Sequence, residues 1–106
     1  MTEMDAASRA QVAETAFIQG DRLVELGRLD DARAAYTAGH DVVLDLPVLH
    51  REAHVRLLPV HQALGLRGAV LEDRVLLLLA PVGVFRLAAW ALSLKAKLRG
   101  RALYPA

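Results

Sequence analysis

The chain has 106 residues, which corresponds to one ordinary domain, and 55% of them are hydrophobic, with the strong helix formers Leu and Ala dominant. It contains no cysteine, so disulfides, thiolate metal sites and cysteine catalysis are excluded. The 13 basic and 12 acidic residues nearly cancel, which gives no reason to expect a nucleic-acid partner.

The N-terminal segment leads into a first predicted helix, over about 5–26. Its sequence, MTEMDAASRAQVAE, is polar and acidic where a secretory signal would be basic and then apolar, so we expect a cytoplasmic protein. The helix is predicted by small and apolar residues at spacings of three and four: Ala13, Ala16, Phe17, Gly20, Leu23 and Gly27. Gly27 is predicted to end it in a left-handed cap.

A second helix is predicted over about 30–45. Asp30 or Asp31 at its start would accept free backbone amides and complement the helix dipole. Pro47 is expected to stop it, because proline disfavours helix at the residue before it. The predicted buried stripe consists of Ala32, Ala35, Tyr36, Gly39, Val43 and Leu46.

Residues 13–46 resemble a tetratricopeptide-repeat hairpin. The matching residues are Gly20, Gly27, Ala32 and Tyr36, at the spacings which that motif uses for helix packing. The resemblance implies that small residues let the two helices approach while the aromatic ring fills the gap. Only one copy is found, whereas an array needs about three repeats for stability. The resemblance therefore implies the hairpin geometry more than a superhelical binding surface.

Three more helices are predicted, over about 48–64, 69–80 and 84–99. Pro59 is expected to kink or break the first of them, and Pro81 and Gly83 separate the last two. Residues 75–94 are about as long as a membrane span, but the break and Arg86 near its middle argue against one. We therefore predict an all-α bundle of four or five helices.

All four histidines of the chain lie between residues 40 and 61. His50 and His54 share one helical face, and folding back around Pro47 should bring His40 to the height of His54. If these three imidazoles act as ligands, they form a site for Zn, Cu or Fe, whose nitrogens would lie about 3–4 Å apart. Neighbouring carboxylates that could bind the ion or orient a ring are Asp41, Asp45 and Glu52. His61, roughly 10 Å along the helix from His54, is expected to stay outside the site.

The metal site is one of three interpretations of the histidines, and our first interpretation is a structural role. They could be interior residues that each bond a carboxylate, a backbone carbonyl or another histidine. They could also form a pH-sensitive interface, since imidazole titrates near neutrality. The chain has no HExxH motif and no nucleophile–base–acid set, so we expect a protein that is not an enzyme.

The apolar C-terminal half predicts a binding surface. Phe85, Arg86 and Trp90 are the candidate interface residues, and Lys95–Arg101 supplies a basic end. Leu and Val exceed what a domain of this size buries, so our first functional hypothesis is a non-enzymatic interaction or scaffold module, bound to a protein partner or a second copy. The alternatives are a metal-binding protein and a protein associated with a membrane surface through residues 84–101.

The order of features also resembles the small bacterial family of domain of unknown function 3703. The matching residues are Gly39-His40, His50, His54, Val70-Leu71 and Leu79-Ala80-Pro81-Val82-Gly83. That family carries no established activity, so the resemblance implies only a stand-alone helical domain with grouped histidines.

Overall fold

The computed structural model describes residues 4–103, with side chains for residues 4–98. Within this part the chain is all-α, as predicted, with five α-helices, one short 3₁₀ helix and no strand. The elements are α1 (Ala6–Glu25), α2 (Leu29–Asp41), α3 (Pro47–Ala63), α4 (Arg67–Leu79), η1 (Ala80–Val82) and α5 (Val84–Leu103).

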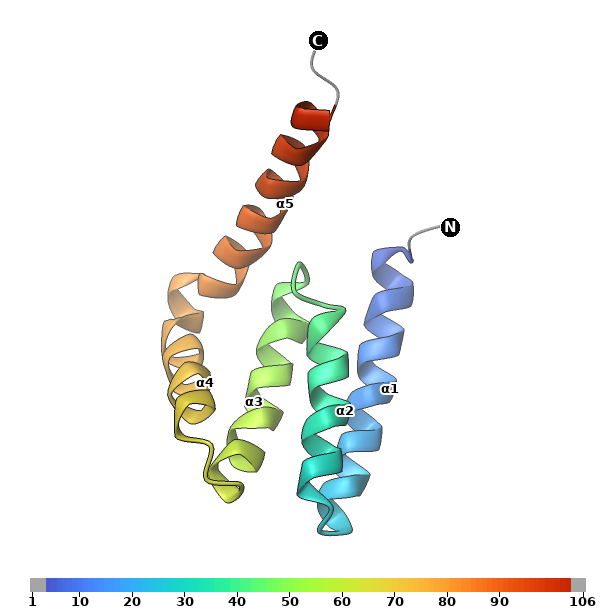
Figure 1. The fold of residues 1–106 in the computed structure, drawn as a ribbon, viewed down its shortest axis with the longest axis vertical. Helices are drawn as coiled ribbons and strands as arrows, with labels where there is room; N and C mark the ends of the chain where they lie inside the picture. Colours follow the sequence, from blue (N-terminus) through green and yellow to red (C-terminus); the bar gives the residue numbers. More distant parts are fainter. Residues whose placement is uncertain (1–3, 104–106) are drawn as a thin grey trace.

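The first four helices alternate in direction and pack side by side in chain order (Figure 1). The most extensive packing is between α1 and α2, followed by the packing of α3 against its two neighbours. The last helix, α5, turns away from α4 and extends beyond the other helices, and its start lies against α3. The bundle therefore consists of a tightly packed N-terminal hairpin and a more open C-terminal half.

Two glycines set the close approach of α1 and α2. A Cβ at Gly20 would collide with the Tyr36 ring, and one at Gly39 would lie 2.7 Å from Cε1 of Phe17. Phe17 is 2% exposed and Tyr36 is 3% exposed, so each aromatic ring fills the space left by the glycine on the opposite helix. The Tyr36 hydroxyl donates to Asp21 at 2.5 Å, and burial, followed by this bond, raises the pKa of Tyr36. Because each aromatic ring packs onto a glycine of the opposite helix, small residues are required on this face.

The turn after α2 differs from the prediction. The helix ends at Asp41 and not near residue 45, and Pro47 does not stop α2 but begins α3. Proline suits the first helical position, because its missing N–H would have no partner there and its φ is already helical. Val43, in the turn, is fully buried. α3 continues through Pro59 to Ala63, so this proline does not end the helix.

The corner between α4 and α5 is formed by η1 and Gly83. Gly83 has φ +86°, a left-handed conformation that side chains rarely adopt. The predicted break at Pro81 and Gly83 is therefore present, and the segments Arg67–Val82 and Val84–Leu98 meet at 93°. Of the described helices, none alone is long and apolar enough to cross a membrane, although this bent pair together has the required length and composition.

Candidate metal centre

Three of the four histidines meet between α2 and α3. One ring nitrogen from each of His40, His50 and His54 lies within 4.8 Å of the other two. The ring centroids are 4.8 Å apart for His40 and His50, 4.9 Å for His40 and His54, and 5.1 Å for His50 and His54. The predicted convergence across the turn is therefore present, because the i, i+4 pair on α3 faces the last turn of α2. We call these three residues the histidine cluster.

Two ring nitrogens of the histidine cluster are buried without a hydrogen-bond partner. They are Nδ1 of His50 and Nε2 of His54, in residues that are 7% and 3% exposed. A buried polar atom left unsatisfied costs about 1–3 kcal/mol. Native interiors rarely contain such atoms, and an ion or a water molecule commonly satisfies them.

The other ring nitrogens of His40 and His54 are held by carboxylates. Nδ1 of His54 lies 2.6 Å from Oδ1 of Asp73, and Nδ1 of His40 lies 2.9 Å from Oδ1 of Asp41. A carboxylate accepts, so Nδ1 is the donor in each ring and Nε2 keeps its lone pair. A carboxylate that orients a histidine through its outer nitrogen is the usual support of a metal ligand.

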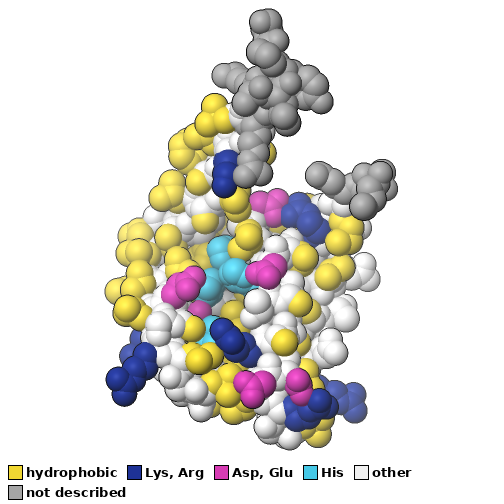
Figure 2. Space-filling model, in the orientation of Figure 1, with side chains coloured by type: hydrophobic (Ala, Val, Ile, Leu, Met, Phe, Trp, Pro, Cys, Tyr) yellow, Lys and Arg dark blue, Asp and Glu magenta, His cyan; other side chains and the backbone are white. Residues whose placement is uncertain are grey.

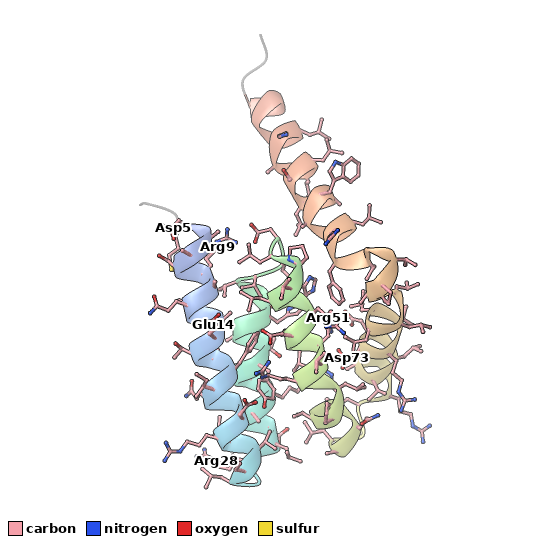
Figure 3. The ribbon with its side chains drawn as sticks, turned by 180° about the vertical axis from the view of Figure 1, so that it is seen from behind. Asp5, Arg9, Glu14, Arg28, Arg51 and Asp73 are labelled. Atoms are coloured by element: carbon pink, nitrogen blue, oxygen red, sulfur yellow. The ribbon has the colours of Figure 1, made fainter. Side chains whose placement is uncertain are left out.

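Asp73 also holds His61. The carboxylate is 1% exposed, and its second oxygen, Oδ2, accepts from Nδ1 of His61 at 2.6 Å. Figure 3 labels Asp73 between α3 and α4. His61 thus stays outside the histidine cluster, as expected, but is linked to it through a shared buried carboxylate.

Asp73 was not among the residues predicted from the sequence. A signal for it exists, because Asp73 lies at helical spacing among the less exposed residues of α4 and its flanks, which are Leu66, Ala69, Val70, Leu76, Leu77 and Ala80. Acids are rarely buried without a partner, so an acid at an inward-facing position of a helix is unusual. Seen only as part of the charged triplet Glu72-Asp73-Arg74, Asp73 looks like an ordinary surface residue. The stripe is hidden in the sequence because Leu71, Val75, Leu78 and Leu79 make the other faces apolar too.

Phe85 closes one side of the histidine cluster. Its ring centroid lies 4.9 Å from that of His50 and 5.9 Å from that of His54, and the residue is 4% exposed. Phe85 was expected at an exposed interface, but it is buried against the histidines at the start of α5. The other two candidate interface residues, Arg86 and Trp90, are exposed.

The other predicted carboxylates lie elsewhere. Asp45 forms an ion pair with Arg9 of α1, and its bond to this guanidinium lowers the pKa of Asp45. Glu52 lies 3.8 Å from Arg56, on the same helix. Neither belongs to the histidine cluster, so Asp41 alone of the three acts on a cluster ring.

The environment keeps His50 neutral. Burial lowers its pKa to about 4, with a further contribution from the neighbouring His40 and His54 rings. The neutral imidazole is the form that binds a metal ion. Histidine side chains are visible in the middle of the face drawn in Figure 2, with acidic side chains on both sides and a basic side chain below them.

The spacing of the nitrogens is wider than that around a bound ion. Ligands of one zinc lie about 3–4 Å apart, and the limit here is 4.8 Å. To bind one ion, the ring nitrogens would have to approach one another by about an ångström. The donor set, the free lone pairs and the supporting carboxylates therefore fit a transition-metal ion.

Neither a family model, nor a curated protein, nor a solved structure matches the chain.

Proposed function

We propose that this protein binds one transition-metal ion through His40, His50 and His54. The observation that carries the proposal is the pair of buried, unpartnered nitrogens within a cluster of three imidazoles. A bound ion would accept the lone pairs of both nitrogens and remove the cost of leaving them unsatisfied. The bonds to Asp41 and Asp73 support the same assignment, because they orient two of the three rings with Nε2 free.

The chemistry of the donors narrows the choice of ion. Three neutral imidazoles suit Zn²⁺, Cu²⁺, Ni²⁺ or Fe²⁺, whereas Mg²⁺ and Ca²⁺ require oxygen ligands. The chain has no cysteine, so softer thiolate sites are not available. We therefore expect Zn²⁺ or Cu²⁺ to bind and Ca²⁺ not to compete.

The decisive experiment compares His50→Leu with the unmodified protein. Leucine fills a similar volume and removes the unpartnered nitrogen while leaving Asp73 and its two bonds in place. We expect the protein purified without chelator, or titrated with Zn²⁺ in a calorimeter, to hold one ion per chain, and His50→Leu to hold none. His54→Ala should also lose the ion.

His61→Gln is the matched control. It removes a histidine outside the cluster, and the glutamine amide still donates to Asp73. We expect its metal stoichiometry to equal that of the unmodified protein. No uptake by the unmodified protein, or equal uptake by His50→Leu, would contradict the proposal.

A second candidate function rests on the exposed apolar residues of α4, η1 and α5, which we call the α4–α5 apolar surface. Its most exposed members are Leu71 (64%), Leu78 (79%), Val82 (79%), Leu87 (61%) and Trp90 (61%). Large exposed apolar patches mark sites of association. We propose that a second copy of the chain covers this surface, and sedimentation velocity over a range of concentrations tests it. Pelleting with anionic vesicles, without self-association, would instead favour a membrane surface.

A further inference from the structure

The histidine cluster supplies three ligands, and the described residues offer no fourth. We infer that the bound ion keeps one coordination position for an exchangeable small ligand, which is water or hydroxide in the resting protein and is replaceable by a small anion. This inference rests on the proposed metal binding. An exchangeable position would make the metal centre a binding site for small ligands. Metal binding alone would suggest only storage of the ion or structural support.

The nearest candidate ligands are already engaged. Asp41 accepts from Nδ1 of His40, and Asp73 accepts from Nδ1 of both His54 and His61. Each oxygen of Asp73 is already held by a buried bond of 2.6 Å, to an imidazole that is less than a tenth exposed. Among residues 4–98, the group of potential ligand residues that meets at this point contains the three histidines alone.

One member of the histidine cluster, His40, brings it to the surface of the protein. Phe85 covers His50 and His54 with a ring that has no donor atom for a metal. His40 is the most accessible of the three, with 20% of its side chain exposed, and histidines are visible at the surface in Figure 2. Structural zinc sites close their fourth position with a protein ligand, whereas sites with three protein ligands hold water there.

The charge of the centre favours an anion at that position. Three neutral imidazoles leave the charge of a divalent ion uncompensated within its coordination sphere. The nearest negative groups, Asp41 and Asp73, act only through the outer nitrogens of the rings. A bound water would therefore be polarised toward hydroxide, and a small monoanion would replace it.

The test uses the full chain loaded with Co²⁺, whose visible absorption reports its coordination, and sodium azide as the probe. We expect azide to change the visible spectrum in a saturable manner at constant metal content. His61→Gln should respond in the same way. A spectrum that stays unchanged by azide while one Co²⁺ remains bound per chain would overturn the inference and leave metal binding intact.

Two other outcomes are also decisive. If a second copy supplied the fourth ligand, loading would produce a dimer and azide would have no effect, which overturns the inference. If Co²⁺ did not bind, or bound equally to His50→Leu, the proposed function would fail and this inference with it.

Discussion

The two halves of the molecule use their interiors in opposite ways. In the α1–α2 hairpin, the buried side chains are apolar or aromatic, with Phe17 and Tyr36 packed against the opposite helix. In α4 the one buried residue is Asp73, while Leu71 and Leu78 of the same helix are exposed. The hairpin thus follows the rule that hydrophobic burial stabilises a fold. The C-terminal half buries apolar residues on α3 and at the start of α5, but it also places a polar network inside and leaves large apolar side chains of α4 and α5 outside.

This difference indicates where stability and function lie. A buried carboxylate shared by two imidazoles contributes less to folding than apolar packing of the same volume, and is often retained for another purpose. The apolar outer face of α4 and α5 gains nothing from folding of the isolated chain. We therefore expect stability to depend mainly on the hairpin, and ligand binding to depend on the second half together with His40 at the end of α2.

The largest expected effect is the difference in unfolding free energy between truncating a large apolar side chain in the hairpin and truncating one in the C-terminal half. Phe17→Ala should lower the free energy of unfolding by about 3–5 kcal/mol, because it leaves a cavity opposite Gly39. Leu78→Ala, at a site that is 79% exposed, should change it by less than about 0.5 kcal/mol. Urea denaturation followed by circular dichroism measures both. Similar losses for the two variants would show that Leu78 is buried by a partner copy or that the contrast between the halves is wrong.

The second prediction concerns acidification of the metal-free protein. The pKa of His50 is lowered from 6.5 to about 4 by burial and by its two histidine neighbours. Between these two pH values the unfolded chain binds a proton at His50 and the folded chain does not. Its contribution to stability is fully present above about pH 6.5 and falls as the pH drops to about 4, by up to about 3 kcal/mol.

Denaturant unfolding across this pH range, in the presence of chelator, measures that loss. His50→Leu is the control, since it cannot titrate at this position. The difference in stability between the two proteins should grow in favour of the variant as the pH falls. If the difference in stability between the two proteins stayed constant with pH, His50 would be accessible to water and the interior around it would be hydrated.

A smaller effect is expected at the carboxylate. Asp73→Asn keeps the shape of the side chain but no longer presents two acceptor oxygens to His54 and His61. Loss of the group that orients a metal ligand typically reduces affinity by about 10–100-fold, and calorimetric titration with Zn²⁺ measures it. Glu72→Gln, on the exposed side of α4, should leave the affinity unchanged.

The metal-free protein provides an independent measurement of the same residue. In ¹⁵N-detected spectra of the imidazoles, Asp73→Asn should shift His54 away from the form protonated at Nδ1. If both the affinity and the ring signals stayed the same, Asp73 would be a structural residue only.

The contrast between the halves also explains what could be predicted from the sequence. The hairpin was predictable because its small, apolar and polar positions alternate with helical period, and the convergence of His40 with the α3 pair followed from that geometry. In α4 the period is lost, since apolar residues cover nearly every face, so neither Asp73 nor the exposed side could be identified. The end of α2 was misplaced because Pro47 was assigned to the wrong side of the turn. The two family resemblances remain predictions.

Trp90→Asp is expected to have the smallest effect on folding. It is also the most specific test of the α4–α5 apolar surface. Trp90 is 61% exposed, so the change should alter the unfolding free energy of the monomer by less than about 0.5 kcal/mol. Self-association through the α4–α5 apolar surface should nevertheless weaken, because an aspartate would be desolvated at the contact. Ile18→Asp is the matched control on α1, where Ile18 is 69% exposed. Sedimentation velocity should show concentration-dependent association in the unmodified protein and in Ile18→Asp, and its loss in Trp90→Asp. Equal loss in both variants would mean that added negative charge, and not the α4–α5 apolar surface, governs association.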